Sequence, residues 1–266
     1  MLETSAVGRA QLPRPDVSAA DAAELCRVHF GLEGGIVELG SQQDRNFRID
    51  TASGRFVLKI CHADYATVEL EAQNATLKHL AAIGGAVRVP RIVASGNGAE
   101  ILPLVINGQS CQVRLLDYLD GEPLTSRKYL SPVTVAALGD VGGRIARALQ
   151  IFDHPGLDRL IQWDLRQAIP VAMALMKAIP DEAVRLRIAA AMEAADRIIQ
   201  PLADELRVQA IHHDITDDNV VARPDGDGHP VPVGVIDFGD LTRGWLVADL
   251  AVTCAALLHH VDGDPF

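Results

Sequence analysis

Several features that mark other classes of protein are missing from this chain of 266 residues. Its four cysteines are scattered and form no C-x-x-C pair, which argues against a zinc site or a disulfide framework and favours reduced thiols (Cys26, Cys61, Cys111 and Cys254). No basic block is present, and 24 Lys and Arg stand against 35 Asp and Glu, so nucleic acid and anionic membranes are poor partners. The apolar stretch at residues 246–258 is too short to cross a bilayer. We therefore expect a cytoplasmic protein that binds neither membranes nor nucleic acid.

Two common phosphate-binding motifs are also missing. The sequence has no G-x-x-x-x-G-K-[ST] and no G-x-G-x-x-G, so P-loop and Rossmann nucleotide sites lose their main support. A polar turn at residues 40–46 contains Ser41 and lies between two β-type runs. If the protein binds a nucleotide, we expect backbone N–H groups of this turn and the Ser41 hydroxyl to cover its phosphates.

The pattern of apolar residues divides the chain into two parts. In the first 120 residues, a helix at about 18–31 precedes short β-type runs at 36–39, 46–50, 55–60, 91–94, 101–106 and 112–118, with one helix inserted among them at about 66–83. After Ser131 the pattern is mainly helical, with helices at about 131–152, 181–206 and 246–260 and two β runs at 220–222 and 233–236. We predict an α+β fold with two lobes: an antiparallel sheet lobe with one helix at residues 1–119, which binds a nucleotide, and a mainly helical catalytic lobe at residues 120–266. A ligand would bind in the cleft between them.

One late segment carries the chemistry. His212, Asp214 and Asn219 fit the pattern H-x-D-x-x-x-x-N, and Asp237 follows an apolar β run and precedes Phe238-Gly239. Phosphoryl transfer needs a carboxylate that orients the acceptor hydroxyl, together with oxygen ligands for Mg²⁺. Asp214 is the candidate for the first task, and Asn219 and Asp237 are the candidates for the second.

The first lobe supplies an independent signal. Lys59 lies inside an otherwise apolar strand, where an ammonium needs a charged partner such as a nucleotide phosphate. Glu71, twelve residues on, lies in the expected helix and is our candidate to hold Lys59 in place; Glu69 is the alternative.

These residues resemble the aminoglycoside phosphotransferase and choline kinase family, whose members have the protein-kinase-like fold. Several segments resemble hydroxylysine kinases, including 44–47, 71–74, 113–119 and 234–240, and related kinase-like domains occur fused to class III aminotransferases. The resemblance extends from about residue 20 to 260. It implies a catalytic Asp214, Mg²⁺ at Asn219 and Asp237, ATP or GTP held by Lys59 and Glu71, and a base-binding hinge that includes Leu116 and Leu119. It also implies that His212 and Asp249 brace the catalytic loop.

Two departures from the family pattern qualify this resemblance. His213 stands where the family usually has glycine, and we expect it at the edge of the protein in contact with solvent. The chain also ends soon after residue 258, where family members continue with further helices, so we expect a domain cut from a longer polypeptide.

The expected activity is transfer of a nucleotide γ-phosphate to the hydroxyl of a small amino alcohol or a hydroxy amino acid similar to hydroxylysine. Two alternatives stay open at this point. A non-catalytic kinase-like module that binds a ligand or regulates a fused partner would carry the same motifs. A metal-dependent hydrolase would instead use His212 and His213 as ligands, although neighbouring side chains on an extended loop point apart.

Overall fold

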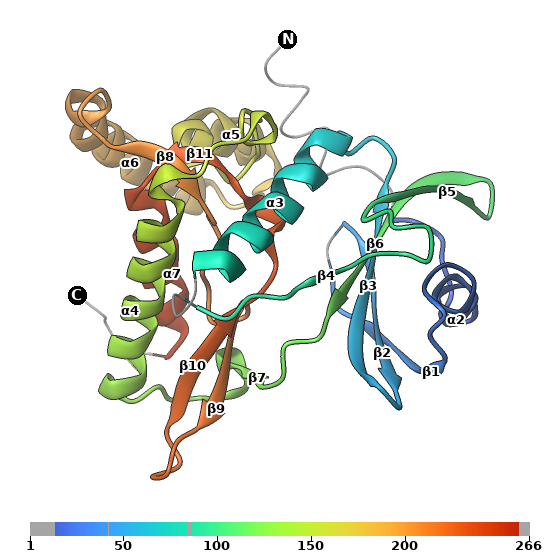
Figure 1. Cartoon of the computed structure of the whole chain (residues 1–266). Helices are drawn as coiled ribbons and strands as arrows, with labels where there is room; N and C mark the ends of the chain where they lie inside the picture. Colours follow the sequence, from blue (N-terminus) through green and yellow to red (C-terminus); the bar gives the residue numbers. More distant parts are fainter. Residues whose placement is uncertain (1–13, 42, 84–86, 261–266) are drawn as a thin grey trace.

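The computed structural model describes residues 14–260 except 42 and 84–86. An antiparallel sheet forms the first lobe, and a helix-rich second lobe follows it in the chain, as predicted (Figure 1). The helical lobe lies on one side of α3 and the sheet on the other. Among the described residues, none of the helices combines the length and the apolar character that a bilayer crossing requires.

The sheet of the first lobe has the strand order β1-β2-β3-β6-β4, and β5 pairs with β6. The first elements are α2 (Ala19–Leu25), the π-helical turn η1 (Cys26–Phe30), β1 (Gly34–Leu39), β2 (Arg45–Thr51) and β3 (Gly54–His62). They are followed by α3 (Thr67–Ile83), β4 (Ile92–Val93), β5 (Leu102–Ile106) and β6 (Gln109–Asp117). Leu58 and Ile60 of β3 are fully buried in the core beneath α2, so the alternating Lys59 leaves the strand on the opposite face.

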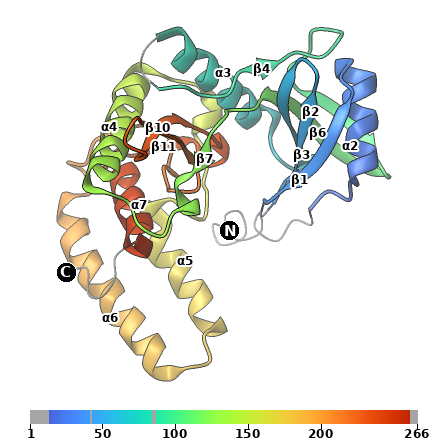
Figure 2. The same ribbon diagram turned by 90° about the horizontal axis from the view of Figure 1, so that it is seen from below.

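The second lobe is built from helices and two small sheets, β10-β9-β7 and β11-β8. Its longer elements are α4 (Pro132–Ala148), α5 (Ala168–Leu175), α6 (Glu182–Ile199) and α7 (Val247–Leu257). Its strands are β7 (Glu122–Pro123), β8 (Val208–Ile211), β9 (Val220–Pro224), β10 (Pro230–Val235) and β11 (Thr242–Trp245). Its short helical turns are η2 (Leu124–Ser126), η3 (Leu149–Ile151), η4 (Pro155–Leu157), η5 (Leu165–Gln167), η6 (Met176–Ala178), η7 (Gln200–Leu202), η8 (Phe238–Asp240) and η9 (Leu258–His260). Figure 2 shows α5 and α6 extending away from the rest of this lobe.

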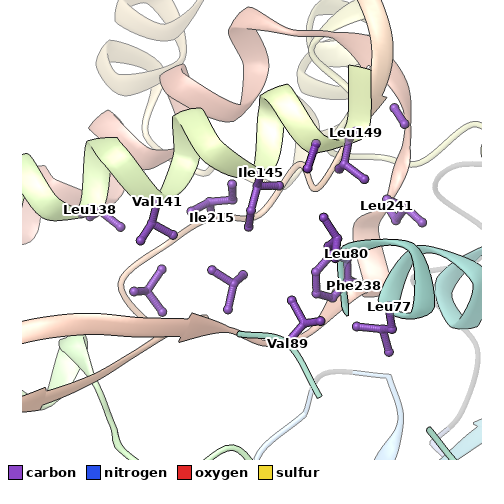
Figure 3. Packing of buried hydrophobic residues seen from close by; sticks show 14 of the residues in the cluster. Leu77, Leu80, Val89, Leu138, Val141, Ile145, Leu149, Ile215, Phe238 and Leu241 are labelled. Carbon is purple, nitrogen blue, oxygen red and sulfur yellow. The ribbon is translucent and has the colours of Figure 1, made fainter. Parts of the chain in front are cut away.

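The two lobes share a hydrophobic core through α3. Leu77 and Leu80 of α3 pack in the same buried cluster as Leu138 and Ile145 of α4 and Phe238 of η8 (Figure 3). The His79 ring reinforces this contact, because its Nε2 lies 2.9 Å from the backbone oxygen of residue 148 at the end of α4. Helix α3 therefore fixes the sheet against the helical lobe.

Candidate active site

The two lobes enclose a cleft of about 1470 Å³. Its lining includes all but one of the site residues that the sequence predicts: Ser41, Lys59, Leu116, Leu119, Asp214, Asn219 and Asp237. Leu116 and Leu119 are buried where the chain leaves β6 for the second lobe. Ser41 is half-buried, and its hydroxyl accepts a hydrogen bond of 3.2 Å from the backbone N–H of Asp44.

An ion pair joins the two lobes across this cleft. The Nζ of Lys59, on β3, lies 2.9 Å from Oδ1 of Asp237. Asp237 is the second residue after the end of β10 at Val235. Burial alone would lower the pKa of Lys59, but the carboxylates of Asp237 and Asp44 outweigh it and raise this pKa above its ordinary value. Conversely, the Lys59 ammonium lowers the pKa of Asp237 against the effect of burial. Lys59 is thus a cation and Asp237 an anion at neutral pH.

Asn219 connects the loop that carries Asp214 to the loop that carries Asp237. The N–H of Ile236 donates to the backbone oxygen of Asn219 at 2.9 Å. Nδ2 of Asn219 donates to Oδ2 of Asp214 at 2.6 Å and to the Asp214 backbone oxygen at 3.0 Å. Asn219 therefore bonds on one side to Asp214 and on the other to Ile236, the residue before Asp237, which holds the two carboxylates near each other.

Asp214 has a perturbed carboxyl group. Burial, followed by the negative charges of Asp240 and Asp237, raises the pKa of Asp214 to about 7, and the hydrogen bond from Asn219 opposes this shift. The carboxyl group thus lies in an environment that disfavours its charge. Environments of this kind are concentrated at functional sites.

His212 and Asp249 brace the loop, as the family resemblance implies. The Asp249 carboxylate accepts the backbone N–H groups of His212 at 3.3 Å and His213 at 2.6 Å. Nδ1 of His212 accepts the N–H of Asp214, so the ring carries its proton on Nε2 and donates it to the backbone oxygen of Ile236 at 3.1 Å. Burial lowers the pKa of His212 to about 4, so the ring is neutral. Both nitrogens of His212 are therefore used by the backbone, and this ring is not placed as a metal ligand of a hydrolase.

The prediction for Glu71 is wrong. Glu71 lies on the exposed face of α3, and Lys59 pairs with Asp237 instead. Glu69 is the buried carboxylate of this helix, and it pairs at 3.0 Å with Arg159 of the helical lobe, whose side chain is 7% exposed. The helical period of the sequence could have indicated that Glu71 is exposed, because it places Glu71 on the same face of α3 as Lys78, seven residues on.

The prediction for His213 is wrong as well. The residue is 3% exposed and adopts a left-handed backbone conformation with φ of 70°. The family glycine would adopt this conformation without strain. Both ring nitrogens of His213 are buried without a hydrogen-bond partner in the part of the chain that the structure describes.

The chain is similar to several known proteins. A model of the phosphotransferase enzyme family matches residues 35–266. The hydroxylysine kinase of Danio rerio is 24% identical over 251 residues, which cover 90% of this chain and 70% of that protein. A microcompartment-associated aminopropanol kinase is 18% identical with a TM-score of 0.69, covering 90% of this chain and 74% of that one. An amicoumacin kinase in complex with AMP-PNP, Ca²⁺ and Ami is 16% identical with a TM-score of 0.64, covering 86% of this chain and 66% of that one.

Proposed function

This chain belongs to the phosphotransferase enzyme family and is a small-molecule kinase, and from this premise we propose that it transfers the γ-phosphate of ATP or GTP to a hydroxyl of a small amino alcohol or a hydroxy amino acid similar to hydroxylysine. One observation supports the proposal above others. Lys59 of the sheet lobe reaches Asp237 of the helical lobe, and Asp214 and Asn219 line the same cleft. This is the set of groups that phosphoryl transfer requires: a cation for the phosphates, oxygen ligands for a metal and a carboxylate for the acceptor.

The residues present fit a magnesium ion. Asp237 offers a carboxylate, and both recorded hydrogen bonds of the Asn219 amide use Nδ2, so its Oδ1 is the atom that would bind a cation. Hard oxygen donors of this kind suit Mg²⁺, which usually takes only one or two protein ligands and fills the rest of its shell with water and phosphate oxygens. When bound there, the metal would neutralise charge on the nucleotide phosphates.

In this proposal Asp214 orients the acceptor hydroxyl and accepts its proton. The hydrogen bond from Asn219 fixes one carboxylate oxygen, which leaves the other oxygen of Asp214 to face the acceptor. Further carboxylates, from Asp218 and Asp240, line the same cleft and act on Asp214. Their negative potential suits an acceptor that carries an ammonium group, which is why we favour an amino alcohol.

A panel of acceptors tests the proposal directly. Phosphate transfer would be measured with ATP and with GTP against hydroxylysine, ethanolamine, choline, homoserine and an aminoglycoside. We expect transfer to at least one of the small amino alcohols and hydroxy amino acids. Nucleotide binding without transfer to any acceptor would favour a non-catalytic kinase-like module instead.

Replacing the proposed catalytic carboxylate gives a sharper test. Asp214→Asn should lower turnover by at least a thousandfold and change the affinity for nucleotide little, because catalysis here depends on positioning of the hydroxyl. Asp140→Asn, which alters an exposed carboxylate of α4 outside the cleft, is the matched control and should keep its full rate. An Asp214→Asn variant with a nearly native rate would refute the role of this residue.

We also propose a cytoplasmic location. Cys26, Cys61 and Cys111 are buried free thiols, and burial raises the pKa of Cys26 and Cys61 to about 12. Free thiols are typical of reducing compartments.

A further inference from the structure

A second buried cation lies beside Lys59 on the cleft face of the sheet. Arg114 of β6 is the register partner of Lys59 of β3, so both side chains leave the sheet on the same face. Arg114 is only 2% exposed, and it lines the same cleft as Lys59. A buried charge is costly unless a partner compensates for it, so the position of this arginine requires an explanation.

The partners that hold Arg114 are neutral. Its Nη1 donates to Oδ1 of Asn74 at 3.0 Å, and its Nη2 donates to Oε1 of Gln73 at 2.6 Å, both from α3. The ion pairs recorded for the described residues include none to Arg114. The two amides therefore fix the orientation of the guanidinium without neutralising its charge.

Helix α3 sends its carboxylates elsewhere. Glu69 pairs with Arg159 of the helical lobe, and Glu71 is exposed. The negative charges that act on this region come from Asp44 and Asp237, which also act on Lys59. Once Asp237 binds a metal, two cations remain here against the single carboxylate of Asp44.

Unpartnered polar atoms mark the same region. Within the described part of the chain, Nε of Arg114 is buried and has no hydrogen-bond partner, and the same holds for Oδ1 of Asn46. Asn46 is the register partner of Lys59 on the other side, so Asn46, Lys59 and Arg114 form one row across β2, β3 and β6. Buried polar atoms without partners are rare in folded proteins, and here both belong to residues that line the cleft.

We propose that Arg114 is a second phosphate-binding residue, which donates from Nε to the phosphate chain of a nucleoside di- or triphosphate beside Lys59. Gln73 and Asn74 are positioning residues that hold the guanidinium for this contact. The inference rests on the proposed function, since it assumes that the cleft binds a nucleotide. An arginine fork is suited to this task because it forms charge-assisted hydrogen bonds with phosphate oxygens.

Calorimetric titration of purified variants tests the proposal. Adenosine, ADP and ATP, or the guanosine series if the wild type prefers it, would be titrated in Mg²⁺ buffer into wild type, Arg114→Met and Arg27→Met. Arg114→Met should weaken ADP and ATP about tenfold to a hundredfold, the value of a hydrogen bond to a charged group, and leave adenosine within about twofold. Arg27 is exposed and pairs with Glu24, so Arg27→Met controls for the loss of one positive charge from the same lobe.

Gln73→Glu provides a second variant that keeps the arginine. A carboxylate at this position would pair with Nη2 of Arg114 and neutralise it, so ADP should again bind more weakly while adenosine binds normally. Circular dichroism and thermal unfolding would establish that each variant is folded, and Gln73→Glu carries the test if Arg114→Met does not fold. Equal ADP affinity in wild type and in the folded variants would overturn the role of Arg114 alone. A wild type that binds none of these nucleotides would overturn the proposed function together with it.

Discussion

Replacing Gly156 with alanine would test how tightly the helical lobe packs on α3. Gly156 is buried in η4, and a Cβ atom added there would lie 2.0 Å from the backbone oxygen of Val68 and 2.9 Å from Cβ of Ala72. A carbon and an oxygen normally stay more than 3 Å apart, so the overlap exceeds about 1 Å. The obstacle is helix backbone and not a flexible side chain, so one of the two segments has to move.

The expected cost lies at the upper end of the range for overpacking, about 3 kcal/mol in the free energy of unfolding. For a chain of this size, that corresponds to a fall in the melting temperature of about 6–12 °C. Urea unfolding followed by circular dichroism would measure the free energy, and differential scanning calorimetry would measure the temperature.

The chain offers a matched control for the same chemical change. Gly139 is exposed in the middle of α4, and a Cβ atom added there would meet nothing within 4 Å. Gly139→Ala should therefore stabilise the protein by about 0.5–1 kcal/mol, because alanine favours the helix over the unfolded chain. Opposite signs for the two variants are the essential result. A Gly156→Ala protein as stable as the wild type would show that the close contact between η4 and α3 does not exist.

Two further predictions concern buried ionisable groups. Glu69→Gln should lower the free energy of unfolding by about 3 kcal/mol, because it leaves the buried Arg159 without its carboxylate. Glu71→Gln, on the exposed face of the same helix, should change this free energy by less than about 0.5 kcal/mol. Chemical denaturation measures both values, and an equal or larger loss for Glu71→Gln would contradict the assignment. His212 has a pKa lowered from 6.5 to about 4, chiefly by burial, so its contribution to stability is fully present above pH 6.5 and is lost as the pH falls to 4. Over that range the free energy of unfolding of the wild type should therefore fall relative to that of His212→Gln, by up to about 3 kcal/mol, and parallel pH profiles of the two proteins would contradict the shift.

The predicted site residues that the structure brings into one cleft are those that short stretches of sequence indicate. Asp214 and Asn219 lie five residues apart on one loop, and a single polar residue inside an apolar strand indicates Lys59. Local patterns also predict α3 and the two lobes, because helices and strands of this length have clear hydrophobic periods. A short stretch of sequence contains both the residue types and their spacing, so these predictions need no knowledge of tertiary contacts.

Glu69 and Glu71 were the two candidates to hold Lys59, and a contact with the other lobe excludes Glu69. On α3, Glu69 shares its face with Gln73 and Thr76, four and seven residues on, and all three are buried. The period of the helix groups these residues from sequence alone. What the sequence does not state is that this face turns to Arg159, ninety residues away, which makes Glu69 a structural anchor and not a partner of Lys59.

Arg114 shows why the rest of the site needs the structure. In the sequence it is one arginine in a mostly apolar run, similar in kind to Lys59, and either residue could extend to solvent at the end of its strand. The register of β3 with β6 places the two side by side, and the amides of α3 then hold the guanidinium inside the cleft. Because α3, β4 and β5 lie between β3 and β6 in the chain, no hairpin turn sets this register. It depends on burial of the opposite face, where a slip of one residue would turn Arg114 away from the cleft and Leu115 into it. The pairing of β3 with β6 therefore brings the two cations together in the proposed phosphate site. The sequence shows each cation in its own strand, so it does not predict that they are neighbours.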